Sequence, residues 1–204
     1  MSQPDFEGAK RYALERLERE LPPTLLYHSV AHTRDDVLPG VERLAAMEGV
    51  VGESLLLLRT AALYHDIGFV EQYENNEAIG VRIAAQVLPG FGYSPMHMQV
   101  MRGIIMATRL PQSPHMLLEE IMADADLDVL GREDFWLQNQ ALRTEMATFG
   151  TPVSDEEWYS GQLKFLQNHS YFTESARTLR AERKQKNIEA MKELLVRITG
   201  QDWA

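Results

Sequence analysis

The sequence predicts an all-α protein, and three observations lead to this prediction. Apolar side chains recur at intervals of three and four along most of the chain. Glycine and proline residues separate these apolar segments. No alternating strand pattern extends beyond a few residues. With 204 residues, of which 45% are hydrophobic, the chain is expected to form a single domain over residues 1–204 with a substantial core.

The N-terminal part is expected to contain three helices. The first covers residues 5–20 and stops at the segment 21–24, which holds two prolines that cannot continue a helix. The second runs from about 29 to 48, with a kink expected at Pro39–Gly40. The third, Glu53–His65, is apolar almost all round, so it is expected at the centre of a bundle.

The rest of the chain is expected to continue as helices joined by short loops. Gly68 ends the third helix, and residues 69–76 are predicted to form a loop. Ser154 and Glu157 have the spacing of a capping box and predict the start of a helix. Breaks at glycine or proline delimit the predicted helices, which cover 77–88, 95–109, 115–130, 134–149, about 154–169 and about 173–199.

Composition restricts the function classes that the chain can serve. Its net charge of −10 argues against binding a nucleic-acid polymer, which calls for a basic surface. It has no cysteine, which fits a cytoplasmic protein, and any metal must be held by His, Asp, Glu and water. Such ligands suit Mn, Fe, Mg, Ni or Zn. The N-terminus lacks the pattern of a signal peptide, and no apolar run approaches the roughly 20 residues that span a membrane.

Two histidine motifs are candidates for metal binding. His28 and His32 are four apart and share one face of a helix, although an isolated pair at this spacing is also an ordinary surface feature. His65 and Asp66 follow the apolar helix 53–65, where the end of the helix can turn both side chains toward one ion. The alternative is a capped core helix with a buried histidine. However, burying Asp66 without a partner would be costly.

An acidic cluster further along the chain supplies candidate carboxylate ligands. Asp126 lies beside Leu127, near the apolar face of its predicted helix. Asp124 and Asp128 share another face, where their repulsion favours a nearby cation. The alternative is a solvated acidic turn.

In combination, these spacings resemble the HD-domain superfamily of metal-dependent phosphohydrolases. That superfamily has a first His, then a His-Asp pair, then a distant Asp on a helical scaffold, which here correspond to His32, His65, Asp66 and Asp126. Tyr27-His28-Ser29-Val30-Ala31-His32 also resembles the Tyr-His-x-x-x-His segment of cyclic-nucleotide phosphodiesterases. The resemblance implies an HD-type helical bundle with a phosphodiesterase-like core over about 25–130. Additional C-terminal helices, about 131–200, are expected to pack on or beside this core.

The resemblance implies a metal-dependent phosphohydrolase acting on a phosphomonoester or phosphodiester of a small, nucleotide-like molecule. One divalent metal is expected on His32, His65, Asp66 and Asp126. Asp66 would also orient the attacking water, and His28 would donate a proton to the leaving oxygen. Three basic side chains are candidate phosphate contacts or, alternatively, solvated charges: Arg34, Arg109 and Lys164.

Asn76 is the main departure from the family pattern. Two-metal relatives carry a His at this place, so a second tightly bound ion is not expected. His97 and His115 could substitute, but structural roles are favoured for both. A catalytically inactive domain that binds metal or nucleotide and regulates a partner remains an alternative function, and a two-iron oxygenase is a third. The apolar segment 194–196 could pack within the chain or between copies in a homo-oligomer.

Overall fold

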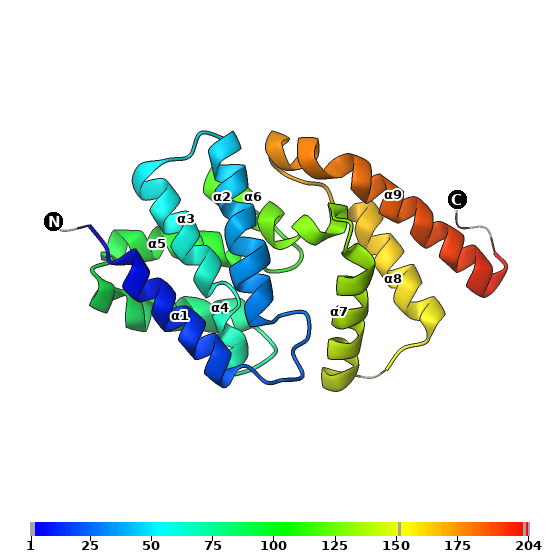
Figure 1. Cartoon of the computed structure of the whole chain (residues 1–204), viewed down its shortest axis with the longest axis horizontal. Coiled ribbons are helices and arrows are strands. Elements are labelled where there is room, and N and C mark those ends of the chain that lie inside the picture. The colour runs from blue at the N-terminus through cyan, green and yellow to red at the C-terminus, as the bar shows by residue number, and fades with distance from the viewer. Residues whose placement is uncertain (1–2, 151, 202, 204) are drawn as a thin grey trace.

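A computed structural model describes residues 3–150, 152–201 and 203 of the chain. The described residues are helical with no strand, so the predicted all-α class is confirmed. Figure 1 shows α1–α6 gathered in one bundle and α7–α9 beside it, with the termini at opposite ends. The α-helices are α1 (Phe6–Glu20), α2 (Leu38–Met47), α3 (Gly52–Tyr64), α4 (Asn76–Val87), α5 (Pro95–Met106), α6 (Leu117–Asp126), α7 (Phe135–Phe149), α8 (Asp155–Asn168) and α9 (Glu174–Thr199).

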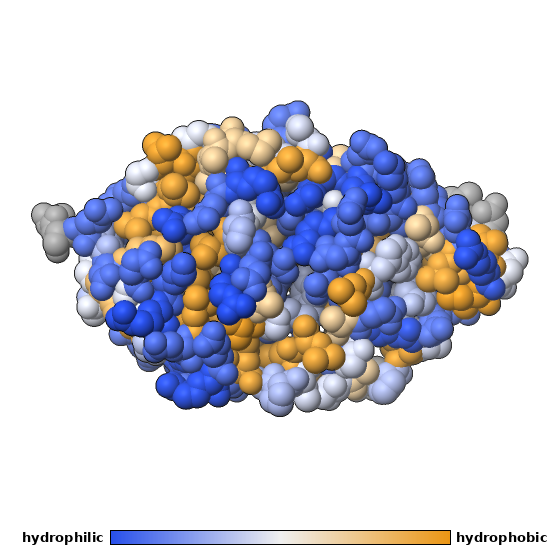
Figure 2. Space-filling view, viewed as in Figure 1, coloured by the Kyte–Doolittle hydropathy of each residue, from blue (hydrophilic) through white to orange (hydrophobic). Residues whose placement is uncertain are grey.

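Two apolar clusters hold the chain together. The larger one is centred on α3, whose Leu58, Ala61 and Leu63 are fully buried, as the apolar character of this segment predicts. The smaller one joins α7, α8 and α9 through residues such as Leu166 and Leu195. Figure 2 shows a mainly polar surface with separate apolar patches, one of them near the C-terminal end of α9. None of the helices described could cross a lipid bilayer.

The second predicted helix differs from expectation in the position of its distortion. In place of a kink at Pro39–Gly40, a π-helical turn covers His32–Val37 and leads directly into α2. The Leu38 amide donates to the carbonyl of Thr33, five residues earlier. Pro39 cannot donate to the carbonyl four residues before it, and the wider turn accommodates its ring. His32 is the first residue of this turn.

Several predicted boundaries shift where short 3₁₀ turns replace the ends of helices. The predicted loop 69–76 overlaps a 3₁₀ turn at Ile67–Val70. The predicted helix 115–130 is shorter, because α6 ends at Asp126 and a 3₁₀ turn, Asp128–Gly131, follows it. A further 3₁₀ turn covers Leu88–Phe91. The capping box of α8 is confirmed: Ser154 Oγ accepts from the Glu157 amide at 3.2 Å and Glu157 Oε2 accepts from the Ser154 amide at 2.9 Å.

Candidate metal centre and cavity

The histidines and aspartates singled out in the sequence come together at one point of the bundle. His65 Nε2 lies 3.1 Å from Asp66 Oδ2 and 3.4 Å from Asp126 Oδ1. His32 Nε2 lies 3.7 Å from Asp66 Oδ2 and 3.3 Å from Asp126 Oδ1. These side chains come from the π turn, the end of α3 and the last residue of α6. The structure therefore brings together the residues that the resemblance assigns as ligands.

The end of α3 explains how two neighbouring residues face the same point. His65 keeps helical backbone angles, whereas Asp66 leaves them at φ −102° and ψ 2°. The next turn packs tightly against the start of α4, because a Cβ atom on Gly68 would lie 1.9 Å from the carbonyl oxygen of Asn76. Only glycine allows this approach. It brings the Asn76 amide within 3.2 Å of Asp66 Oδ1, to which Nδ2 donates.

The chemistry of this cluster fits a bound cation. His65 Nδ1 donates to the carbonyl of Ala62 at 2.8 Å, which leaves a lone pair on Nε2 of the neutral imidazole. Nε2 faces Asp66 Oδ2, and both atoms are buried with no hydrogen-bond partner among the described residues. Two unsatisfied acceptors in contact are unfavourable unless a proton or a metal ion lies between them.

Imidazoles are the basic groups that contact Asp66 and Asp126 among the described residues. Within the described part of the chain, neither carboxylate pairs with a lysine or an arginine. Burial lowers the pKa of His65, but the negative charges of Asp66 and Asp126 outweigh it and raise that pKa well above its ordinary value. Burial raises the pKa of Asp126, while the neighbouring imidazoles of His32 and His65 lower it further than burial raises it. The cluster therefore favours positive charge at its centre.

The separations between the ligand atoms also suit one ion. Nitrogen and oxygen ligands about 2.0–2.2 Å from a metal lie roughly 3–4 Å from one another in tetrahedral or octahedral arrangements. Nitrogen or oxygen atoms of His32, His65 and Asp66 all lie within 4.8 Å of one another. Imidazole and carboxylate ligands suit Mn, Fe, Ni or Zn, and carboxylates also suit Mg. His32, His65 and Asp66 could hold such an ion.

The other aspartates of the acidic cluster have structural roles instead. Asp124 accepts from the amides of Phe172 and Thr173, each at 2.8 Å, and from the Thr173 hydroxyl at 2.7 Å. Asp128 pairs with Arg180 at 2.6 Å and with Arg43 at 3.3 Å. The cations expected near this pair are therefore the guanidinium groups of Arg180 and Arg43 at Asp128, while donors just before α9 satisfy Asp124, so neither carboxylate needs a metal ion.

His28 lies beside the cluster of His32, His65, Asp66 and Asp126 and is held by a residue that the sequence did not single out. Its Nδ1–H donates to the fully buried carboxylate of Glu145 on α7. Glu145 also accepts from the amides of Tyr27 at 2.9 Å and His28 at 3.1 Å, and from the Tyr73 hydroxyl at 3.3 Å. Burial lowers the pKa of His28, but the bond to Glu145 and the charge of Asp66 raise it above its ordinary value.

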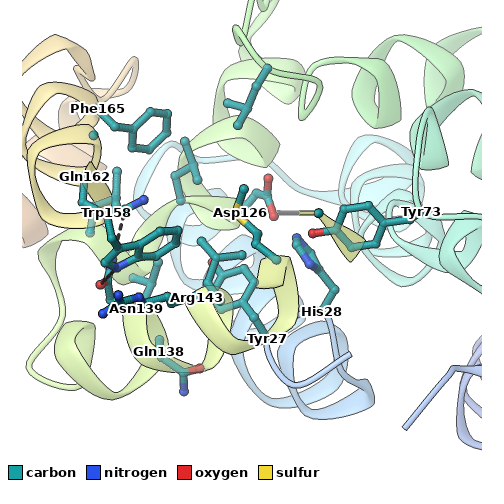
Figure 3. Close-up of a pocket in the computed structure, with 18 of the residues that line it drawn as sticks. Tyr27, His28, Tyr73, Asp126, Gln138, Asn139, Arg143, Trp158, Gln162 and Phe165 are labelled. Carbon is teal, nitrogen blue, oxygen red and sulfur yellow. Dashed lines mark hydrogen bonds between the residues drawn. The ribbon is translucent and has the colours of Figure 1, made fainter. Parts of the chain in front are cut away.

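A cavity of about 980 Å³ extends from Asp66 and Asp126 toward α7 and α8. Figure 3 shows His28, Asp126 and Tyr73 on one side and Trp158, Gln162 and Phe165 opposite them. Arg109 lines this cavity, whereas Arg34 and Lys164 do not. Arg34 is exposed and pairs with Asp35 at 2.8 Å and with Glu18 at 3.6 Å. Of the predicted phosphate contacts, the geometry therefore favours Arg109 alone.

The residues considered as ligands for a second ion are Asn76, His97 and His115. Each of them either forms a hydrogen bond with another residue or lies outside the cavity. Asn76 donates to Asp66, as described above. His97 takes part in the cap of α5 and pairs with Glu53 at 3.1 Å. His115 is exposed and does not line the cavity.

Comparisons of the chain with protein-family models, with curated proteins and with solved structures found no match.

Proposed function

We propose that the protein is a metal-dependent phosphohydrolase acting on a small phosphorylated molecule. The observation that carries this proposal is the cluster of His32, His65, Asp66 and Asp126, which contains two buried acceptors without a partner among the described residues and of which Asp66 and Asp126 line a cavity beside His28. The resemblance of these spacings to HD-domain phosphohydrolases supports the same function. A divalent ion in such a cluster would lower the pKa of water and neutralise charge on a phosphoryl oxygen.

The side chains around the cluster have distinct roles in the proposed reaction. Asn76 donates to Asp66 Oδ1 and fixes the orientation of this carboxylate, whose Oδ2 faces the cluster. In hydrolysis, the bond between phosphorus and the alcohol oxygen breaks and a bond between phosphorus and a water oxygen forms. The departing oxygen needs a proton, and His28 is placed to donate it. Arg109 would contribute positive charge to the cavity wall.

Glu145 is a positioning residue for this proton transfer. Because its carboxylate holds Nδ1–H of His28, the opposite nitrogen, Nε2, is left to carry the transferable proton. The carboxylate also stabilises the imidazolium form, which is the form that can act as an acid. Tyr73 and two backbone amides hold Glu145 in place, so His28 is oriented before a substrate binds.

Metal content and phosphate release together test the proposal. The purified protein is analysed for bound metal, stripped with a chelator and reconstituted separately with Mn, Fe, Mg, Ni and Zn. Each form is then assayed on nucleotides, cyclic nucleotides and simple phosphomonoesters. We expect Asp66→Ala to lose bound metal and phosphate release together, because it removes a ligand carboxylate.

Asp35→Ala is the matched control, since it removes an exposed carboxylate near His32 without touching the cluster. It should keep both metal and activity. Full metal content in Asp66→Ala would contradict the ligand assignment. Metal binding by the unmodified protein without turnover of any phosphoester would contradict the hydrolase and favour a binding domain.

A further inference from the structure

Gly161 occupies an unusual position in the wall of the cavity. It lies in the interior of α8, where glycine destabilises a helix relative to alanine. Its backbone needs no positive φ, and a Cβ atom at this position would meet nothing within 4 Å. Neither backbone conformation nor close packing therefore requires glycine here.

The direction that a side chain at position 161 would take follows from its helical neighbours. Glu157 and Phe165 are four residues before and after it, so all three positions share one face of α8. Both neighbours line the cavity, as does Gly161 itself. Figure 3 shows Trp158, Gln162 and Phe165 entering the cavity from α8. A side chain at position 161 would therefore occupy space that is now open.

The cavity is larger than a phosphate group requires. Its volume of about 980 Å³ is near the upper end of the roughly 300–1,000 Å³ found for small-molecule sites. Its wall away from the metal cluster is mainly apolar and aromatic, and includes Leu127, Leu130, Phe135, Leu142, Trp158 and Phe165. Burying an apolar body of comparable size against such a wall favours binding, because it removes apolar surface from water.

Charges in the cavity wall argue against a substrate with several phosphates. Beyond the metal cluster, the acidic side chains of Glu77 and Glu157 line it together with Arg109 and Arg143. Arg143 is already paired with Asp155 at 2.7 Å. Arg109 is then the remaining basic side chain of this wall without an ion pair among the described residues. One phosphoryl group can be compensated at the cluster, but the further phosphates of a polyphosphate chain would lie near the negative charges of Glu77 and Glu157, with Arg109 to offset them.

We infer that Gly161 is a specificity-determining residue that leaves room for the leaving group of the substrate, and that this substrate carries one phosphoryl group on a bulky, mainly apolar or aromatic body. This inference rests on the proposed function. In the reaction R–O–PO₃²⁻ + H₂O → R–OH + HPO₄²⁻, the body R occupies the space beside Gly161. The phosphoryl group lies at the cluster, and the proton from water reaches the departing oxygen through His28.

The test is a pair of substitutions at matched glycines. Gly161→Leu places a branched apolar side chain at the cavity wall. Gly90→Leu adds the same side chain at a glycine that, like Gly161, is exposed and has nothing within 4 Å, but that does not line the cavity. The metal-loaded proteins are assayed on 1-naphthyl phosphate, ethyl phosphate and a nucleoside triphosphate. Circular dichroism checks that each variant is folded, which is expected because leucine favours a helix more than glycine does.

We expect the unmodified protein to prefer naphthyl phosphate over both other substrates in kcat/KM. Gly161→Leu should lower the ratio of kcat/KM for naphthyl over ethyl phosphate by at least about tenfold, the scale on which a filled pocket discriminates. Gly90→Leu should leave the ratio unchanged. An unchanged ratio in Gly161→Leu, or a preference of the unmodified protein for the triphosphate, would overturn the inference.

A binding measurement separates failure of this inference from failure of the proposed function. Isothermal titration calorimetry with 1-naphthol, the alcohol without its phosphoryl group, reports on the apolar part of the cavity whether or not any ester is hydrolysed. Binding to the unmodified protein and to Gly90→Leu, with at least tenfold weaker binding to Gly161→Leu, supports the role of Gly161 even if no phosphoester is turned over. Equal binding by all three proteins, or binding by none, contradicts it.

Discussion

The buried carboxylate of Glu145 on α7 accepts a hydrogen bond from Nδ1 of His28, 117 residues earlier in the chain. This bond ties the C-terminal helices to the proposed reaction centre, because it connects α7 with the segment that precedes the π turn. The His28 ring also lies 4.5 Å from the Phe69 ring between centroids, so apolar packing and a charged partner fix it together. The contact makes α7 part of the site.

The pH dependence of activity tests the role of Glu145. The carboxylate raises the pKa of His28, so the protonated imidazole persists to higher pH than it would alone. If His28 is the general acid, activity falls as pH rises through this pKa. Glu145→Gln removes the charge but keeps the size of the side chain, so the pKa of His28 should fall. The basic limb of the kcat/KM profile should therefore move to lower pH.

The control for this experiment is Glu133→Gln, which removes a similar charge from an exposed ion pair with Arg183. Its pH profile should match that of the unmodified protein. If Glu145→Gln loses activity uniformly at all pH values and the basic limb does not move, Glu145 serves packing alone.

Leaving-group dependence tests His28 itself. We expect His28→Ala to retain its metal but to lower kcat about a hundredfold or more for alkyl esters, whose leaving oxygen needs a proton. The loss should be smaller for nitrophenyl esters, which leave without protonation. His115→Ala, which changes an exposed histidine outside the cavity, is the control. Equal losses on both ester types would assign His28 a metal-related or packing role.

The sequence was informative where local chemistry decides the structure. Prolines and glycines indicated most helix boundaries, and the apolar character of Glu53–His65 predicted a buried central helix. The spacing of His32, His65, Asp66 and Asp126 predicted a cluster that the fold assembles. Such features depend on neighbours within a few residues, or on a resemblance that already encodes the fold.

Features that depend on contacts between helices far apart in the chain could not be predicted from local sequence patterns. Glu145 is the single acidic residue of α7 and lies on the same face as Leu142 and Phe149, but nothing local indicates that His28 will meet it. Asp124 and Asp128 have the spacing of a repelling pair, and only the position of α9 shows that Thr173 and Arg180 satisfy them. The cavity likewise depends on distant contacts, because residues of α8 line it together with Asp66 and Asp126.

Stability at mildly acidic pH should depend on His169. Both ring nitrogens of this residue are buried without a hydrogen-bond partner among the described residues, and the ring lies against Tyr171 with centroids 4.7 Å apart. Burial and the nearby charge of Lys184 lower the pKa of His169 to about 4. The unfolded chain, with a histidine pKa of about 6.5, therefore binds this proton first as pH falls.

The resulting loss of stability is present below about pH 6.5 and grows until the pH reaches the folded pKa of about 4. His169→Phe removes the titrating group and keeps an aromatic ring, so its free energy of unfolding should fall less steeply between pH 6.5 and 4. Urea denaturation at several pH values measures this slope. His115→Phe, at an exposed histidine, should retain the slope of the unmodified protein, and an identical slope in His169→Phe would contradict the assignment.

We predict that Asn76 limits the number of metal ions that the protein binds. Its side-chain amide donates to Asp66 Oδ1 at 3.2 Å, so it orients a proposed ligand, and a neutral amide oxygen binds a transition metal far more weakly than an imidazole. We therefore expect one tightly bound ion per chain, with at most a weak second ion. Elemental analysis gives the stoichiometry, and anomalous scattering from crystals gives the positions. Two full-occupancy ions about 3.5–4 Å apart in the unmodified protein would contradict this expectation.

The substitution Asn76→His tests whether an imidazole at position 76 allows a second ion to bind. An imidazole at the start of α4 would lie next to Asp66 and could complete a second site with Glu77 and water, so the affinity for a second ion should rise. Asn76→Asp is the matched comparison. It adds a negative charge beside Asp66 but no imidazole, so a gain that comes from charge alone appears in Asn76→Asp, whereas selectivity of the second site for Ni or Zn over Mg should appear only in Asn76→His. If neither variant binds a second ion, the geometry around Asp66 rather than the chemistry of Asn76 limits the site to one metal.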